Sequence, residues 1–445
     1  MHAKTIAHMT PGRVILISLL ATIAGGTFVL FLPASQVVPI PWIDLLFTAT
    51  SATCVTGLAT VPISAFTPLG QLALLVLMQI GGLGLITMTI FVLSLFTQIG
   101  FSTQLLVGKI LELESWKNIK QLLFFIIKFS IAVELTGAAC IYFCIQEQVR
   151  PLRRIFMALF HSVSSFCEAG FTVWPDSMMA YANNIPLLII TALLMIVGGL
   201  GFITWTEIFE HIKARAQQKH RFLSLYTKIV LYTTFSLIFF STTLYWALER
   251  THAFAHMPFS QALINAFFNA VASRSTGFIT VYTTHLHIAT LFAIMLIAFI
   301  GSSPGSTGSG IKTTTFAVLL ATIHAAISGR TSVEIKGRRI PRDQVFKALA
   351  IIGLSVGWII MTIFCLLITE QAWEFFDIVF EVVSAFATLG LSTGITPDLT
   401  IVGKLLIALT MIVGRIGSLT LVLAIMRNRK ELHEYEYPEE RIMLG

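Results

Sequence analysis

The sequence is poor in charged side chains. Asp, Glu, Lys and Arg make up 11% of its 445 residues, whereas 56% are hydrophobic. A soluble domain carries about 25% charged residues. So few charges cannot cover the surface of a water-soluble fold of this length. The composition therefore excludes a soluble globular protein and predicts an integral membrane protein.

Cysteine is also scarce, and the five cysteines lack the spacing of a metal site or a disulfide framework. Cys140 and Cys144 share one helix face, and we interpret them as small buried hydrophobic side chains. Candidate catalytic groups such as Glu134, His161 and Glu207 are scattered along the chain. This scatter argues against a membrane enzyme.

Apolar runs divide the chain. Eight are long enough to cross a hydrocarbon core, which needs about 20 residues: 14–32, 70–96, 122–145, 186–209, 226–248, 288–323, 346–368 and 402–426. The first exceeds the usual hydrophobic region of a signal peptide, so we expect it to be retained. Between the members of each pair lies an apolar stretch too short to span, which predicts a re-entrant helix: 42–53, 152–166, 259–272 and 373–387.

The short stretches end in a fourfold repeat. In each copy a Phe stands ten positions before a Gly, in the segments 47–57, 160–170, 267–277 and 380–390. The glycines are separated by 113, 107 and 113 residues, and so regular a period indicates repeated units. We predict an all-α integral membrane fold of four parallel helix–pore-loop–helix repeats. Eight transmembrane helices and four re-entrant pore helices would surround one pore with pseudo-fourfold symmetry.

The predicted organisation follows the repeats. It comprises repeat 1 over 1–97, repeat 2 over 98–213, repeat 3 over 214–328, repeat 4 over 329–426 and a tail over 427–445. Lys and Arg concentrate in the segments that join the repeats and near both chain ends. This bias predicts a multi-pass protein with cytoplasmic termini and pore loops that enter from outside.

The four loops are the candidate selectivity filter. Non-helical backbone at membrane depth is tolerated where it lines water, and its carbonyl oxygens can replace the hydration shell of a cation. Glycine adopts the necessary positive φ at low cost. The predicted filter residues are Val55, Thr56, Gly57, Glu168, Ala169, Gly170, Ser275, Thr276, Gly277, Thr388, Leu389 and Gly390. We expect Glu168 to tune the mouth, and we expect Arg274 to turn away from the ion path and pair structurally.

The second helix of each repeat carries a glycine motif, and the third copy departs from it. Gly81, Gly198 and Gly414 begin short G-x-x-G motifs, whereas residues 301–315 are dense in Gly, Pro, Ser and Thr. We interpret this stretch as an intramembrane gate, with a static broken helix as the alternative. The predicted gate residues are Gly301, Ser302, Ser303, Pro304, Gly305, Ser306, Thr307, Gly308, Ser309, Gly310, Lys312 and Arg415.

Arg415 is an intramembrane arginine, which is costly and marks a functional site by default. We expect it to restrict flow together with the loop, and a structural contact is the alternative. Lys312 is expected to hold the loop closed by bonding carbonyl groups. Whether Arg415 or Lys312 is the main barrier stays open.

The four filter glycines, the Gly/Ser/Thr insertion in the third unit and the Arg in the fourth resemble the Trk/Ktr/HKT superfamily of cation transporters. Within it, the short chain is most similar to the KtrB-type membrane subunits of bacterial Ktr potassium uptake systems. The resemblance covers nearly the whole chain. It implies K⁺ uptake across the plasma (cell inner) membrane, with K⁺ bound at Gly57, Gly170, Gly277 and Gly390. A Na⁺-permeable or weakly selective transporter of the same superfamily is the alternative.

The resemblance also implies partners. It predicts a homodimer in the membrane and a cytoplasmic ring of RCK/KTN (KtrA-like) regulatory subunits, with no role for nucleic acid. ATP/ADP or NAD(H) is expected on that ring, no cofactor is expected on this chain, and Na⁺ is a possible activator or symported ion. Candidate docking surfaces are the loops 210–228 and 329–347 and the tail 427–445, with solvated cytoplasmic charge as the alternative.

Overall fold

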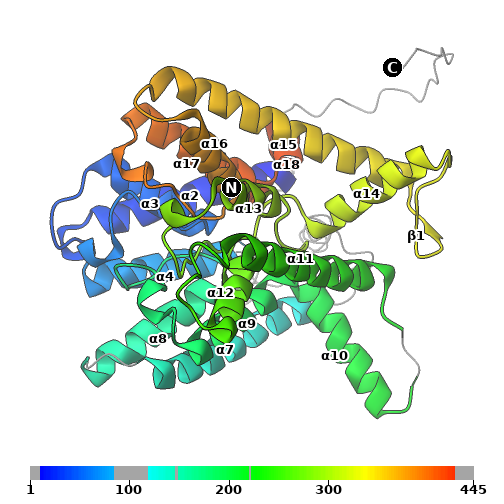
Figure 1. Ribbon diagram of the computed structural model, residues 1–445, viewed down its shortest axis with the longest axis horizontal. Coiled ribbons are helices and arrows are strands. Elements are labelled where there is room, and N and C mark those ends of the chain that lie inside the picture. Colours follow the sequence, from blue (N-terminus) through cyan, green and yellow to red (C-terminus); the bar gives the residue numbers. More distant parts are fainter. Residues whose placement is uncertain (1–10, 85–118, 146–148, 220–221, 426–445) are drawn as a thin grey trace, which may run out of the picture.

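The computed structural model describes residues 11–84, 119–145, 149–219 and 222–425 (Figure 1). The predicted boundary between repeats 1 and 2 and the tail 427–445 lie outside the described residues. The first helices of the four units are α2 (Pro11–Phe31), α7 (Ile119–Cys144), α11 (Leu225–Glu249) and α15 (Arg342–Thr369). These four helices, in the described part of the chain, are long and apolar enough to cross a membrane.

Four short helices lie where the apolar pattern predicts them: α3 (Trp42–Cys54), α8 (Pro151–Phe166), α12 (Phe259–Ala272) and α16 (Phe375–Ala387). Proline stands at the N-cap or first position of three of them, where it costs no hydrogen bond, and Glu374 stands at the N-cap position of the fourth without a side-chain capping bond. These helices are largely buried although they carry hydroxyl groups. In α3, Thr48, Thr50 and Thr53 donate to the carbonyl four residues earlier at 2.7, 2.8 and 2.7 Å, which satisfies each hydroxyl inside the core.

The second helices are shorter than the predicted spans. They are α4 (Pro68–Gly82), α9 (Ile185–Gly199) with α10 (Phe202–Ala216), α13 (Ile288–Phe299) with α14 (Thr313–Ile327), and α17 (Ile401–Ile416) with α18 (Ser418–Ile425). The prediction of a continuous span over 186–209 is wrong, because α9 and α10 meet at 96°. The rest of the predicted span 70–96, beyond residue 84, lies outside the described residues.

Glycine explains where α4, α9 and α17 end. Gly84, Gly201 and Gly417, each three residues after the first glycine of its motif, have φ values of 84°, 89° and 88°. That left-handed conformation ends a right-handed helix and costs glycine little. The G-x-x-G motif was visible in the sequence, but the apolar composition continues across it and hides the break.

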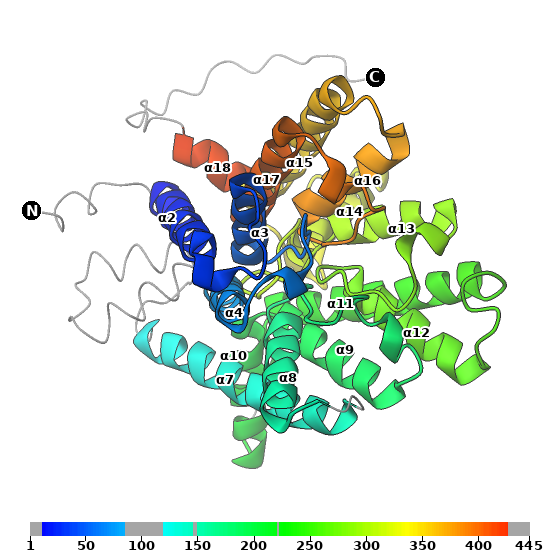
Figure 2. The same ribbon diagram turned by 90° about the vertical axis from the view of Figure 1, so that its left-hand side faces the viewer.

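Contacts between helices close a cycle. Within each unit the first helix packs on the short helix: α2 on α3, α7 on α8, α11 on α12 and α15 on α16. Between units the second helix packs on the next short helix: α4 on α8, α9 on α12, α13 on α16 and α17 on α3. Figure 2 shows the short helices around the loops at the centre of the molecule. The last unit thus returns to the first.

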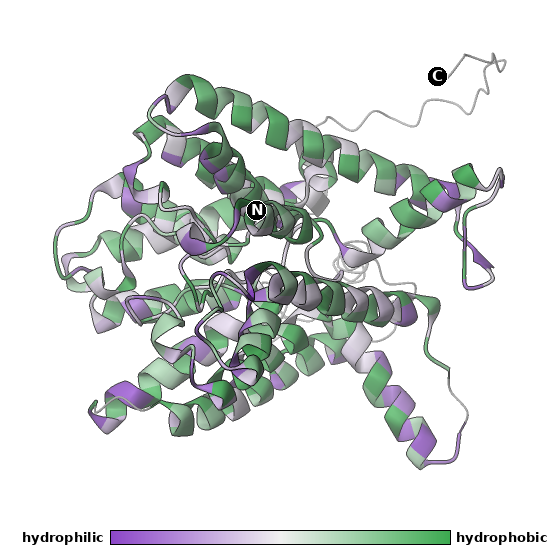
Figure 3. Ribbon diagram, viewed as in Figure 1, coloured by the Kyte–Doolittle hydropathy of each residue, from purple (hydrophilic) through white to green (hydrophobic). Residues whose placement is uncertain are grey.

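The outer surface is apolar on the long helices. Phe235 and Phe239 on α11 and Met361 and Phe364 on α15 are exposed, as is expected of side chains that face lipid. Figure 3 shows hydrophobic residues along these helices and hydrophilic ones on α10, which projects from the body, and near the hairpin β1 (Glu334–Ile335) and β2 (Arg338–Arg339).

The cysteines are free thiols in different surroundings. Cys54 and Cys167 are buried, Cys144 is partly buried, and Cys140 is exposed on α7. The prediction that Cys140 is buried is therefore wrong. Apolar side chains occur on every face of its helix, so the hydrophobic pattern did not identify the face that packs inward.

Candidate functional site

The loops that follow the four short helices form a ring. A Cβ atom added to each motif glycine would overlap or crowd the carbonyl oxygen of a residue in the following unit: Gly57 that of Ala169, Gly170 that of Thr276, Gly277 that of Leu389, and Gly390 that of Thr56. Each partner is the residue just before the next motif glycine. Four loops separated by more than 100 residues in sequence therefore lie edge to edge around one centre.

Positive φ angles shape this ring. The glycines have φ values of 95° at Gly57, 71° at Gly170, 70° at Gly277 and 86° at Gly390. Both their backbone conformation and the close approach of the neighbouring carbonyl exclude a side chain at these positions. This is the physical reason for one glycine in each repeat.

Three of the loops share a second feature. Val55, Glu168 and Thr388 adopt the left-handed conformation with φ of 58°, 60° and 50°. The next amide in each loop donates at 2.8 Å to a serine carbonyl five residues earlier, namely Ser51, Ser164 or Ser384. A left-handed residue in a non-glycine position is uncommon and is often found at functional sites.

The loop of the third unit is built differently. The amides of Thr276 and Gly277 both donate to the carbonyl of Ala272, at 3.0 and 2.9 Å. Ser275, at the position of the left-handed residues, does not have a positive φ. The third loop thus reaches the same ring by a tighter turn.

A cavity of about 330 Å³ lies on one side of the ring, and all four motif glycines line it. Leu58, Phe171 and Leu391, which follow three of them, also contribute to its wall. Glu168 is not part of the lining, and its role at the mouth stays a prediction. Its carboxylate instead accepts a hydrogen bond from Ser302 at 2.6 Å, on the opposite side of the ring.

The segment between α13 and α14 occupies that opposite side. Gly301 donates to the carbonyl of Ile311 at 2.9 Å, and Ser302 donates to that of Ser309 at 3.2 Å. The segment therefore folds back on itself as a closed loop, and the backbone bridge at its base, between Ile300 and Ile311, is parallel. We call this loop the 301–312 hairpin for its shape alone. A Cβ atom on Gly308 would meet the side chains of Glu168, Ser302 and Ser275, so the tip of the hairpin packs directly against the ring.

The hairpin is fixed to the second unit by backbone hydrogen bonds. Ser303 donates to the carbonyl of Gly199 at 3.1 Å, and Phe202 donates to that of Gly305 at 2.9 Å. The hydroxyl of Thr307 donates to the carbonyl of Phe166 at 2.9 Å. The break between α9 and α10 exposes the backbone groups that make these bonds.

Two basic side chains hold the hairpin, Arg415 to other units and Lys312 within the hairpin itself. Arg415 donates to the carbonyl of Thr307 at 2.6 Å and to the hydroxyl of Ser309 at 3.0 Å, and it also bonds the carbonyl of Gly81. It therefore connects the fourth, third and first units. Lys312 donates to the carbonyl of Gly308 at 2.8 Å, which confirms the predicted bond between this lysine and a carbonyl group.

Arg274 does not line the cavity, and its turn away from the ion path stays a prediction. Its guanidinium lies 3.4 Å from the carbonyl oxygen of Gly301 and is buried. It thereby supports the base of the hairpin.

The first glycines of the mid-helix motifs belong to the site, although the predicted site residues included Gly301 and not its counterparts. A Cβ atom on Gly81, Gly198 or Gly414 would overlap the carbonyl of Thr53, Phe166 or Phe386 at the end of the short helix in the same unit. Small residues allow this close packing in membranes. Their recurrence at matching positions was the sequence feature that could have identified them.

Comparison with known proteins gives one consistent family. The profile of TrkH, described as a cation transport protein, matches residues 2–433. The chain is 36% identical over 440 residues to the Ktr system potassium uptake protein B of Bacillus subtilis, and this covers 98% of the chain and 97% of that protein. It is 35% identical over 441 residues to the potassium/sodium uptake protein NtpJ of Enterococcus hirae, with 95% and 96% covered.

The fold also has a solved counterpart. The crystal structure of the potassium transporter TrkH from Vibrio parahaemolyticus aligns with a TM-score of 0.74 and 17% identity, covering 93% of this chain and 84% of that one. The family match over nearly the whole sequence, and the two relatives above 30% identity, agree with this likeness. The chain is a membrane transporter and not an enzyme, and it belongs to the TrkH family of cation transport proteins.

Proposed function

We propose that this chain is the K⁺-selective, channel-like subunit of a potassium uptake system in the plasma membrane, with the four loops as its selectivity filter. The observation that carries the proposal is the closed cycle of glycine-to-carbonyl contacts between successive loops. Such a ring directs backbone oxygens to a common axis, where they replace the water around a dehydrated cation.

Electrostatics favours a cation at this centre. The helices α3, α8, α12 and α16 each end immediately before a loop of the ring. The C-terminus of a helix carries a partial negative charge of roughly half an elementary charge, so four such ends converge on the centre. The hydroxyl groups of Thr56, Thr276 and Thr388 are buried and have no protein partner among the described residues, so they are available to an ion or its water.

The 301–312 hairpin is proposed as the gate. It lies across the ring from the cavity and is held by Arg415, by Lys312 and by backbone bonds to the second unit. An ion that leaves the ring on this side meets the hairpin, so conduction requires it to move. The positive charge of Arg415 adds an electrostatic barrier at the same level.

Gating is proposed to come from a cytoplasmic regulatory subunit. The relative from Bacillus subtilis is named as one protein of a Ktr system, which supports a partner of this kind. The loops 210–228 and 329–347 offer exposed basic residues, among them Lys213, Arg338 and Arg339, as docking surfaces on the side that the charge bias assigns to the cytoplasm. The proposed assembly is a homodimer above an RCK/KTN ring that binds ATP/ADP or NAD(H).

A weakly selective Na⁺-permeable transporter is the second candidate. It is favoured by the name of the Enterococcus hirae relative, which includes both potassium and sodium. The glycine in every loop favours K⁺, because a side chain at any of these positions would displace a carbonyl of the ring.

The test is complementation of K⁺-uptake-deficient cells at limiting K⁺, with a Ktr-type regulatory subunit co-expressed. The wild type is expected to restore growth, and Gly277→Ser is expected to lose K⁺ over Na⁺ preference because its side chain overlaps the carbonyl of Leu389. Gly353→Ser, at an exposed position of α15 with open space around it, is the matched control and should behave as wild type. Failure of the wild type, or an unchanged ion preference in Gly277→Ser, would contradict the proposal.

A further inference from the structure

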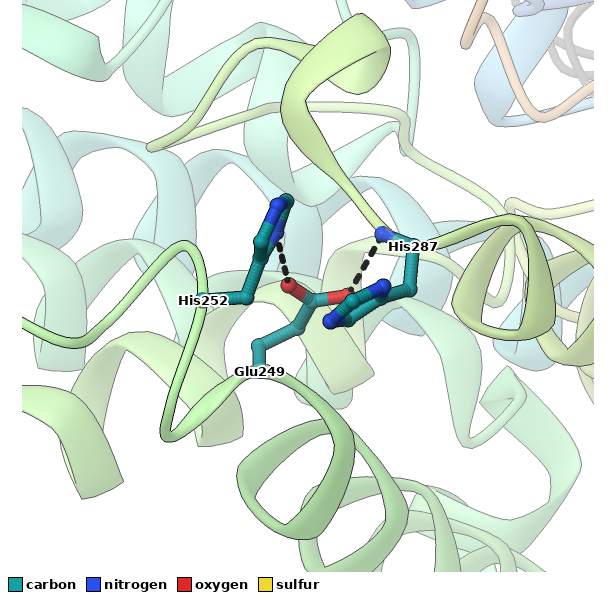
Figure 4. A group of neighbouring side chains, drawn as sticks. All are labelled: Glu249, His252 and His287. Carbon is teal, nitrogen blue, oxygen red and sulfur yellow. Dashed lines mark hydrogen bonds and ion pairs between the residues drawn. The ribbon is translucent and has the colours of Figure 1, made fainter.

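Two histidines and a glutamate lie together where α11 ends and α13 begins. Glu249, His252 and His287 each offer a ligand atom, and these atoms all lie within 4.8 Å of one another (Figure 4). The carboxylate of Glu249 is fully buried, whereas the side chain of His252 is 48% exposed. The cluster is therefore anchored in the protein and open to solvent.

The carboxylate is already oriented by other bonds. One oxygen accepts from the amide of His287 at 3.0 Å and from the hydroxyl of Thr290. The other oxygen lies 3.4 Å from Nδ1 of His252 and accepts from the amide of Ala253 at 3.4 Å. The rings of His252 and His287 lie 4.1 Å apart between centroids, at an angle of 34°. One carboxylate oxygen and two imidazoles thus offer ligand atoms within 4.8 Å of one another.

The fourth unit has the same contact between a glutamate at the end of its first helix and the start of its second helix, but without histidines. Glu370 ends α15 as Glu249 ends α11, and it accepts from the amide and the hydroxyl of Thr400, which caps α17. The residue that corresponds to His287 is therefore Thr400, and the residue that corresponds to His252, three positions after the glutamate, is Trp373. The structural cap needs the glutamate but neither histidine.

We propose that Glu249, His252 and His287 form a binding site for a divalent transition-metal cation of the Zn²⁺ class. Zinc takes imidazole nitrogen and carboxylate oxygen at about 2.0–2.2 Å in a tetrahedron, so its ligand atoms lie about 3.4 Å apart. The Glu249–His252 pair has this spacing already, and small rotations of the exposed His287 ring bring in the third ligand. Water fills the fourth position.

The location gives the site a consequence. Thr283, four residues before His287, lines the cavity beside the ring, so the metal enters from the same side as the cavity. A bound ion would cross-link the end of α11 to the start of α13, whose other end leads into the 301–312 hairpin. The site is thus placed to stiffen the third unit.

The experiment titrates Zn²⁺ into the full chain, purified without a polyhistidine tag, against a fluorescent zinc indicator. The wild type is expected to bind one equivalent. His287→Thr and His252→Trp copy the residues of the fourth unit and should fold, as checked by thermal unfolding and gel filtration. Each is expected to bind Zn²⁺ at least about tenfold more weakly, since it removes one of three protein ligands.

The matched controls are His256→Ala and His285→Ala, which change exposed histidines of the same two connections and should leave binding unchanged. Addition of Zn²⁺ should also raise the unfolding temperature of the wild type and of these controls, but not that of His287→Thr. Three results would overturn the assignment: a wild type without stoichiometric Zn²⁺, cluster variants that bind as the wild type does, or controls that lose as much affinity as they do.

Discussion

The third unit differs from the other three in how the glycine of its second helix packs. In the first, second and fourth units a glycine lets the second helix lie against the end of the short helix, at Thr53, Phe166 or Phe386. In the third unit the corresponding Gly301 lies against Ser309 of its own hairpin. One unit has therefore exchanged a fixed helix contact for a loop, and that loop lies on the axis that all four units share.

The exchange also changes what holds each unit together. The second helices α4, α9 and α17 each pack closely on their short helix, because a glycine of the one lies against a backbone carbonyl of the other. The hairpin is fixed by individual hydrogen bonds from Arg415, Lys312 and Thr307. Because these hydrogen bonds can break one at a time, the hairpin can move without unpacking a helix.

The largest expected effect is the difference in stability between two Gly→Ala variants. One changes a glycine that packs on a short helix, and the other changes the glycine that packs on the hairpin. Gly414→Ala would push against the backbone of Phe386, and we expect it to destabilise the folded protein by about 1–3 kcal/mol, as overpacking does. Gly301→Ala would push against the hairpin, so we expect near-normal stability and an altered uptake rate. Thermal unfolding in detergent and K⁺ uptake measure the two quantities.

The control for this pair is Gly357→Ala on the exposed surface of α15, where a Cβ atom meets open space. It should be neutral or slightly stabilising, because alanine favours helix more than glycine does. Equal loss of stability in Gly301→Ala and Gly414→Ala would show that the third unit is packed like the others.

A smaller effect is expected from Arg415→Ala. This variant removes the bonds to Thr307, Ser309 and Gly81 and the positive charge at the level of the hairpin. We expect most of these bonds to be exchanged for others when the hairpin moves, so that their net effect on gating is about 1.4 kcal/mol and K⁺ uptake rises by about tenfold. Arg250→Ala, at an exposed arginine that covers Trp246, is the control. Unchanged uptake kinetics would remove Arg415 from the mechanism.

The smallest effect should follow Thr307→Val. The change keeps the shape of the side chain but removes its hydrogen bond to the carbonyl of Phe166. A net loss of about 1 kcal/mol predicts a rise in uptake of a few fold. Thr322→Val on α14, where the hydroxyl bonds only the preceding turn of its own helix, should leave uptake unchanged. A Thr307→Val variant with wild-type uptake would mean that this bond does not hold the hairpin.

The sequence predicted the parts of the fold that depend on local pattern. Apolar stretches predicted the short helices. The regular spacing of the four glycines predicted the ring, although the residues around them differ between repeats. The break at Gly201 was missed because the residues on both sides are apolar, so hydropathy shows one run. The hydrogen bond between Glu168 and Ser302 could not be predicted, because it depends on a left-handed backbone at Glu168 and on a residue far away in sequence. Glu249 and His287 could not be paired because tertiary packing alone brings them together.

The most direct test of the account is a density map of the protein prepared in Rb⁺ or Tl⁺, which replace K⁺ and scatter strongly. The account predicts ion density on the axis between Gly57, Gly170, Gly277 and Gly390, lost or displaced in Gly277→Ser. A map that resolves the four loops and holds no ion among them would contradict it.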